Sequence, residues 1–171
     1  MAHLYLFFSG TGNTKYVLKR FIKERNQEDV VLQSIEHNDF NYDEAIGNAN
    51  EITIGYPIYG GIMPSNMKEF LQKYKSKFYK KNLNVIITQM YFSGDGAALA
   101  CRILQSTKPT ILQTIHINMP NNITDLKIFP AQSLKDSSSV IRKADENIEQ
   151  IVKKINQGKT YKMGRRWYSR V

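Results

Sequence analysis

Short apolar runs alternate with amphipathic stretches along this chain. The apolar runs have strand length and are bounded by turn residues, which predicts β-strands over residues 3–8, 30–35, 51–56, 83–90 and 110–119. Between and after them, apolar residues recur at helical spacing. This spacing predicts helices over residues 13–25, 64–74, 97–106 and 135–157, with a short helix near 43–46. Strands that alternate with helices predict an α/β domain, in which helices cover both faces of a mostly parallel sheet.

The charge of the chain is concentrated near its end. No linker, repeat or low-complexity segment interrupts the pattern before about residue 158, so we expect one domain over residues 1–158. Residues 159–171 form a basic tail with five Lys/Arg and no acid, and without it the formal net charge falls from +9 to +4. Residues 68–81 carry six lysines against one glutamate. Such surfaces can bind nucleic acid or anionic lipid, but a solvated helix face and a frayed tail explain the same charges. We expect no nucleic-acid partner.

Cysteine and histidine content excludes several kinds of site. Cys101 is the only cysteine, so one chain holds no internal disulfide and no all-cysteine iron–sulfur or zinc site. His3, His37 and His116 lack the spacing of metal ligands. We expect Cys101 and His116 to pack in the core. No apolar run reaches the length of a membrane span and the N-terminal residues show no signal peptide, so we expect a cytoplasmic protein.

A loop rich in glycine and hydroxyl groups joins the first predicted strand to the first predicted helix. It consists of Ser9, Gly10, Thr11, Gly12, Asn13 and Thr14. The backbone N–H groups at a helix start lack internal partners, and the helix dipole favours an anion there. Glycines allow close approach of the backbone, and the polar side chains add neutral donors. We therefore predict a phosphate site. The alternative is an ordinary turn with Thr11 or Asn13 as N-cap. The loop matches neither G-x-x-x-x-G-K-[ST] nor G-x-G-x-x-G.

Two further loops follow the third and fourth predicted strands, at the same edge of the sheet. Both combine aromatic residues with glycines, which suits a flat ring that stacks on aromatic side chains and approaches the backbone closely. The first contains Pro57, Ile58, Tyr59, Gly60 and Gly61, and the second contains Met90, Tyr91, Phe92, Gly94, Asp95 and Gly96. Asp95 is either a charge near such a ring or the N-cap of the next helix. Asn118, Asn121 and Asn122 are candidates for lining a substrate or partner pocket.

The loop from Ser9 to Thr14 resembles the phosphate loop of the flavodoxin family, whose pattern is T/S-x-T-G-N-T/S. The resemblance covers residues 1–157. In particular, residues 7–14 are similar to the flavodoxin part of bacterial ferredoxin-fused proteins, but this chain lacks their cysteine-rich cluster domain. It implies a doubly wound sheet of five parallel strands in the order 2-1-3-4-5. It also implies FMN as cofactor, with the phosphate on the first loop and the flavin ring clamped by the other two loops.

The resemblance further implies an electron carrier that works with redox partner proteins. The basic charge favours acidic partners, such as ferredoxin-like proteins or a reductase. Carriers of the family are often strongly acidic, whereas this chain is basic. Fewer acidic groups around the ring should repel the anionic reduced flavin less, so we expect the lower of its reduction potentials to be less negative than in acidic relatives. Two alternatives stay open. One is an FMN-dependent NAD(P)H or quinone oxidoreductase with Tyr59, Tyr91 and Phe92 around a substrate. The other is a flavin-free phosphate-binding regulatory module of the same fold.

Overall fold

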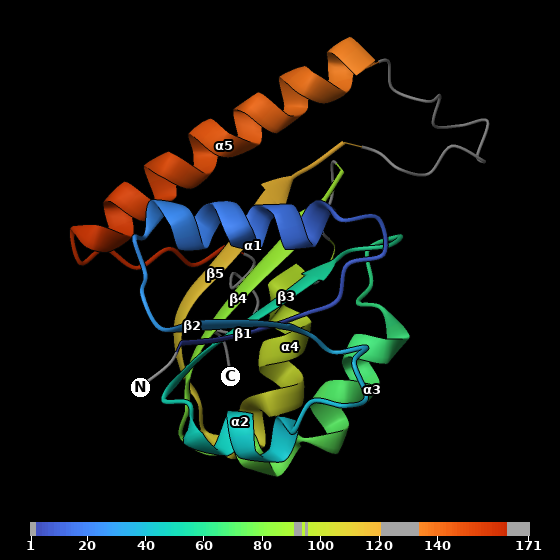
Figure 1. Cartoon of the computed structure of the whole chain (residues 1–171), viewed down its shortest axis with the longest axis vertical. Coiled ribbons are helices and arrows are strands. Elements are labelled where there is room, and N and C mark those ends of the chain that lie inside the picture. The colour runs from blue at the N-terminus through green and yellow to red at the C-terminus, as the bar shows by residue number, and fades with distance from the viewer. Residues whose placement is uncertain (1–2, 91–93, 95, 121–133, 164–171) are drawn as a thin grey trace.

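A computed structural model describes residues 3–90, 94, 96–120 and 134–163. All five strands lie in one parallel sheet with the order β2-β1-β3-β4-β5 (Figure 1). Their bounds are β1 His3–Phe7, β2 Val30–Ser34, β3 Glu51–Pro57, β4 Asn82–Gln89 and β5 Thr110–Asn118. The structure thus confirms the predicted doubly wound α/β fold and its strand order.

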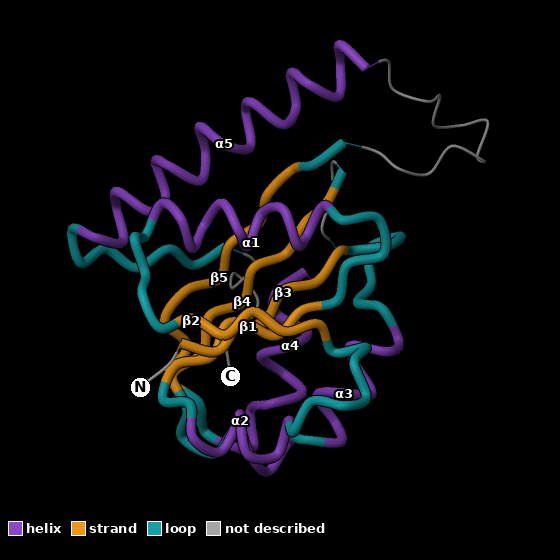
Figure 2. Tube along the Cα trace, in the orientation of Figure 1, coloured by secondary structure: helices purple, strands orange, loops and turns teal. Residues whose placement is uncertain are grey.

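Helices form a layer on each face of the sheet (Figure 2). One layer holds α1 (Asn13–Glu24) and α5 (Leu134–Asn156), and the other holds α2 (Tyr42–Asn48), α3 (Ser65–Lys73) and α4 (Gly96–Leu104). Short 3-10 turns η1 (Lys75–Phe78) and η2 (Gln105–Thr107) follow α3 and α4. The predicted helices are therefore all present, with ends shifted by a few residues at most.

Strand β1 shows why the strands read as continuous apolar runs. Leu4 and Leu6 point into the core under α2, α3 and α4, whereas Tyr5 and Phe7 point into the core under α1 and α5. All four are buried. Because helices cover both faces, alternation of apolar and polar residues is lost, as is usual in parallel sheets.

From helical spacing, the sequence predicts that Tyr16, Val17 and Phe21 of α1 point inward, and the structure confirms only part of this prediction. Val17 and Phe21 are buried as expected, together with Leu18. Tyr16 was predicted to point inward, but its side chain is 40% exposed. Its hydroxyl donates to the carboxylate of Asp145 on α5 at 3.0 Å. A tyrosine satisfies the same helical spacing as an apolar residue, yet its hydroxyl needs a polar partner at the helix–helix border.

The first part of the basic tail adds to the sheet at its β5 edge. Thr114 donates its backbone N–H to Tyr161 at 2.8 Å, and Met163 donates its own to Thr114 at 2.9 Å. The Thr114 hydroxyl also donates to the Met163 carbonyl at 2.7 Å. The sequence leaves open whether the tail docks a partner, packs across the domain through Trp167 and Tyr168, or is a frayed end. Trp167 and Tyr168 lie outside the described residues, and the domain boundary at 158 stays a prediction.

Among the described residues, no helix is long and apolar enough to cross a membrane. The same ranges hold no group of three His, Cys, Asp or Glu side chains suited to a metal ion. Cys101 is half-buried and packs against the core beneath α4, close to the expectation.

Candidate functional site

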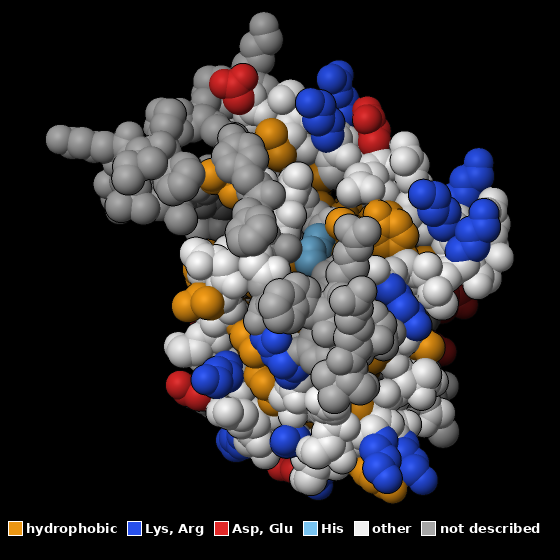
Figure 3. Space-filling model, turned by 180° about the vertical axis from the view of Figure 1, so that it is seen from behind, with side chains coloured by type: hydrophobic (Ala, Val, Ile, Leu, Met, Phe, Trp, Pro, Cys, Tyr) orange, Lys and Arg blue, Asp and Glu red, His pale blue; other side chains and the backbone are white. Residues whose placement is uncertain are grey.

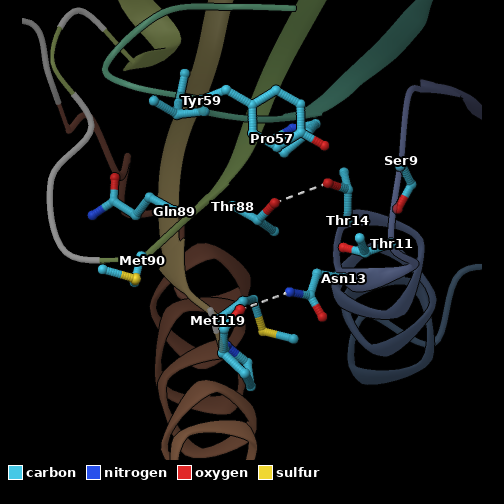
Figure 4. Close-up of a pocket in the computed structure, with 13 residues that line it drawn as sticks. Ser9, Thr11, Asn13, Thr14, Pro57, Tyr59, Thr88, Gln89, Met90 and Met119 are labelled. Atoms are coloured by element: carbon cyan, nitrogen blue, oxygen red, sulfur yellow. Dashed lines mark hydrogen bonds between the residues drawn. The ribbon is translucent and has the colours of Figure 1, made fainter. Parts of the chain in front are cut away.

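A cleft opens at the carboxyl ends of the central strands (Figure 4). It lies where the strand order changes direction, because β2 is added on one side of β1 and β3 on the other. Ligands of doubly wound sheets bind at this switch point. The described residues that line the cleft are Ser9, Gly10, Thr11, Asn13, Thr14, Pro57, Ile58, Tyr59, Thr88, Gln89, Met90, Met119 and Pro120. The structure therefore brings the predicted phosphate loop and the loop after β3 to one place.

Helix α1 begins in this cleft with a glycine as its N-cap residue. Its N-cap is Gly12, in the left-handed conformation at φ 91°, and no acidic residue lies in the first turn. The alternative of an ordinary turn capped by Thr11 or Asn13 is therefore wrong, because neither occupies the cap position. A helix N-terminus with no side chain on its N-cap residue and no acidic residue in its first turn favours an anionic ligand.

Three polar side chains of the loop hold it in place. The hydroxyls of Thr14 and Thr88 lie 2.8 Å apart in a buried hydrogen bond to the end of β4. The Asn13 amide donates to the Pro120 carbonyl at 3.1 Å, and Ser9 Oγ accepts the backbone N–H of Lys15 at 3.2 Å. These contacts fix the start of α1 against the ends of β4 and β5, so backbone N–H groups are the donors best placed for an anion.

We expect the variant Thr14→Val to lose about 1–3 kcal/mol of unfolding free energy, because it leaves the buried Thr88 hydroxyl without its partner. The double variant Thr14→Val/Thr88→Val removes both polar groups and should recover part of this loss. Urea unfolding of the natural chain, Thr14→Val, Thr88→Val and the double variant measures the coupling. Additive losses in the double variant would contradict the pairing.

The loop after β3 turns sharply at its two glycines. Tyr59 and Ile62 exchange backbone hydrogen bonds at 3.1 and 3.0 Å. Gly60 and Gly61 have φ of 56° and 86°, which is the geometry of a type I′ hairpin turn. The Ile58 N–H donates to the Thr88 carbonyl at 2.8 Å and ties this turn to β4. The two glycines are thus required by the turn itself.

Tyr59 reaches from the loop after β3 to the predicted phosphate loop. Its hydroxyl oxygen is only 2.7 Å from where a Cβ on Gly10 would be, so the ring tip rests directly on the phosphate loop. Its side chain belongs to the pocket wall in Figure 4 and is 41% exposed. Partial burial, followed by the negative charge of Glu36, raises the pKa of Tyr59, which keeps the phenol neutral.

The loops after β3 and β4 touch each other through glycine. A Cβ on Gly94 would lie 2.5 Å from the Gly61 carbonyl oxygen and 3.1 Å from the Gly61 Cα. Gly94 thus makes a loop–loop contact, and its predicted contact with a flavin ring stays a prediction. Tyr91, Phe92 and Asp95, and the candidates Asn121 and Asn122, lie outside the described residues, so their predicted roles stay predictions.

Gly96 and His116 form a packed contact behind the cleft. A Cβ on Gly96 would lie 2.7 Å from His116 Cε1, and the Gly96 carbonyl accepts the buried Tyr56 hydroxyl at 2.9 Å. His116 is buried, as expected, and its Nε2 accepts the Ala97 N–H at 3.4 Å. Burial lowers the pKa of His116 to about 4. Of the predicted glycines, only Gly10 is among the residues that line the cleft.

We expect the free energy of unfolding to fall as the pH falls from about 6.5 to about 4. In this range His116 binds a proton in the unfolded chain, whereas the buried His116 of the folded chain stays neutral. The slope from one proton is at most about 1.4 kcal/mol per pH unit. Urea unfolding at several pH values should show a flatter profile for His116→Gln than for the natural chain. His3, whose pKa burial also lowers, is common to both proteins and cancels. Parallel profiles would contradict the assignment.

Sequence reasoning missed four residues of the cleft: Thr88, Gln89, Met119 and Pro120. Thr88 and Gln89 end β4, and polar residues that end an apolar run were a usable signal. Met119 and Pro120 follow β5, which lies beside β4 only because of the strand order. No local pattern marks them.

Comparison with known proteins agrees with this geometry. Residues 4–125 match the family model described as flavodoxin domain. None of the curated protein sequences compared with the chain matches it. The likeness to ferredoxin-fused proteins stays a prediction.

Solved structures show the same fold at low identity. Flavodoxin 2 from Bacillus cereus has 15% identity and a TM-score of 0.62, with coverage of 93% of this chain and 100% of that one. Two-electron reduced Megasphaera elsdenii flavodoxin has 20% identity and a TM-score of 0.60 over 85% and 99%. Fusobacterium nucleatum flavodoxin bound to flavin mononucleotide has 10% identity and a TM-score of 0.59 over 92% and 98%. With a family model that spans most of its length, the chain belongs to the flavodoxin family.

Proposed function

We propose that the chain binds FMN in the cleft and carries electrons between redox partner proteins in the cytoplasm. The observation that carries the proposal is the start of α1, which reaches the switch-point cleft with Gly12 as its N-cap residue and no acidic residue in its first turn. Family membership and the FMN-bound structure of Fusobacterium nucleatum flavodoxin support the choice of ligand.

The residues of the cleft fit a flavin mononucleotide. Backbone N–H groups between Gly10 and Thr14 would hold the phosphate, in a loop that Thr14 and Asn13 already fix in place. The Tyr59 turn would hold one side of the ring system, with the end of β4 at Gln89 and Met90 on the other side. The Tyr59 hydroxyl lies against Gly10. The Tyr59 side chain would therefore have to move when a nucleotide binds between the phosphate loop and the loop after β3.

A carrier function agrees with the chemistry of the lining. FMN, when bound, accepts and returns one or two electrons, and the protein supplies position and electrostatics. Among the described residues that line the cleft, Tyr59 is the only ionisable side chain, and its raised pKa keeps it neutral. Tyr91 and Phe92, which the oxidoreductase alternative places around a substrate, lie outside the described residues.

An absorption spectrum of the purified protein, before and after addition of FMN, tests the proposal. We expect a yellow protein, or a colourless one that takes up FMN with a shifted visible band. Failure to take up FMN would refute it and leave the flavin-free module. Rapid reduction of the bound flavin by NADPH alone would instead support the oxidoreductase alternative.

The surface charge favours acidic partners. Lys and Arg side chains outnumber acidic ones over the face shown in Figure 3. On η1 and beside it, Lys73, Lys77 and Lys80 are exposed. We propose that this charge steers acidic redox proteins to the chain, with rates that fall as salt rises.

We expect the more negative of the two one-electron potentials of the holoprotein to fall further in Ile62→Glu, because a carboxylate beside the Tyr59 turn disfavours added negative charge. Ile62 is 66% exposed, so the change should leave stability nearly unaltered. Ile62→Gln is the uncharged control. A redox titration at low and high salt measures the effect, and equal potentials in both variants would contradict it.

A further inference from the structure

A second cavity lies beside the cleft, along the outer edge of β5. It encloses about 370 Å³ between the end of β5, helix α5 and the tail segment at Tyr161 and Met163. Gln89, Met90 and Met119 line both spaces, so the cavity and the cleft share a wall. The proposed contacts to FMN leave the rest of this cavity unused.

Part of the lining is apolar and adaptable. Met90 and Met119 directly follow β4 and β5, Met163 lies in the tail, and α5 adds Val140 and Ala144. Methionine side chains are polarizable and adjust to irregular shapes, and they contact aromatic rings favourably. This part of the cavity suits a flat apolar body.

The remaining lining is rich in hydrogen-bond donors. His116 belongs to the lining, and because its Nε2 accepts the Ala97 N–H, the neutral ring carries its proton on Nδ1. The Asn118 oxygen accepts from the Gln89 amide at 2.9 Å, which leaves the Asn118 NH₂ group to donate to a ligand. Asn147 on α5 supplies another amide. No carboxylate occurs among the described residues that line the cavity.

Lys143 supplies a cation at the same cavity. Its neighbours on α5 are paired: Arg142 with Glu146 at 3.9 Å, and Asp145 with Arg20 at 3.5 Å. Lys143 is exposed and has no ion pair with any described residue. An unpaired ammonium beside amide and imidazole donors attracts an anion.

We propose that this cavity binds a small organic anion, with a carboxylate paired to Lys143 and a flat apolar body packed on the methionines. The donors of His116, Asn118 and Asn147 orient the carboxylate or another oxygen of the same ligand. Binding itself is independent of the proposed FMN function. Coupling to FMN does rest on that function, because Gln89, Met90 and Met119 then contact both ligands.

Calorimetric titration with 2-naphthoate tests the proposal, using 2-naphthamide as the uncharged probe of similar shape. We expect Lys143→Gln to weaken naphthoate binding about 10-fold, as loss of a charge-assisted contact should, and to change naphthamide binding by less than about threefold. Arg142→Gln removes a neighbouring exposed cation outside the cavity and should leave both affinities unchanged. Val140→Trp, which fills the cavity, should abolish binding of both probes. Thermal unfolding verifies that each variant is folded.

Failure of the natural chain to bind naphthoate at millimolar concentration would overturn the proposal. Equal weakening by Lys143→Gln and Arg142→Gln would also overturn it, because non-specific surface charge would then explain the binding. The titration is made on FMN-free and FMN-loaded protein. A protein that binds naphthoate but takes up no FMN refutes the carrier function and leaves this site standing. Where both bind, each must change the affinity of the other by one common factor, and a factor of one overturns the coupling.

Discussion

The variant Thr11→Asp is expected to bind FMN at least about 100-fold more weakly than the natural chain. A carboxylate next to the N-cap of α1 would face the phosphate across the few ångströms where backbone donors now meet it. Two unit charges about 4 Å apart repel by about 4 kcal/mol at an effective dielectric constant of 20, so 100-fold is a conservative figure after screening.

Stability should change in the opposite direction. The first turn of α1 has no acidic residue, and Thr11 is exposed just before the N-cap. An added carboxylate there interacts favourably with the helix dipole by about 0.3–1 kcal/mol. Fluorescence titration with FMN and thermal unfolding measure the two effects. Thr11→Ser, which keeps a hydroxyl, is the matched control. A variant that loses both FMN binding and stability would show that the loop had collapsed and would not support a phosphate site.

Gly94→Ala is expected to weaken FMN binding at least about 10-fold more than Gly60→Ala does. Both glycines have positive φ, 51° and 56°, so alanine carries a similar left-handed penalty of about 1 kcal/mol at each. The surroundings differ. A Cβ on Gly94 would lie 2.5 Å from the Gly61 carbonyl oxygen, whereas a Cβ on Gly60 meets no atom within 4 Å.

The pair of variants therefore isolates the contact between the loops after β3 and β4. Alanine at Gly94 has to push the Tyr59 turn away from β4, and this moves one side of the cleft. Because the loop edge is exposed at Gly94, most of the cost should appear in FMN affinity and little in global stability. Equal loss of affinity in the two variants would mean that the Gly61–Gly94 contact does not shape the flavin site.

Much of the fold could be predicted because its signals are local. The buried strands appear as apolar runs, and α5 has its buried residues Ala144, Ile148, Ile151 and Val152 at helical spacing. The main error on a helix face, Tyr16, arose because periodicity records spacing and not the partner that a hydroxyl finds on another helix.

The candidate site was only partly predictable. The loop from Ser9 to Thr14 carries its own glycines and helix start, so its anion-binding character is local. The roles of its side chains are not local. Thr14 bonds to Thr88 and Asn13 to Pro120, across separations of 74 and 107 residues. The role of Gly94 beside a flavin ring stays a prediction, and only the structure shows that Gly94 also lies against the backbone of Gly61.

By itself, then, the sequence determined the order of elements, the two-sided burial of the sheet and the loop that we predict to bind an anion, because each depends on residues close together in the chain. Only the tertiary structure decided which of those polar groups remain available to a ligand. It placed Thr88, Gln89 and Met119 in the cleft wall and set Lys143 beside His116 in a second cavity. The physical reason is that hydrogen-bond partners and cavity walls come from strand neighbours, and the strand order β2-β1-β3-β4-β5 brings together residues that no local pattern connects.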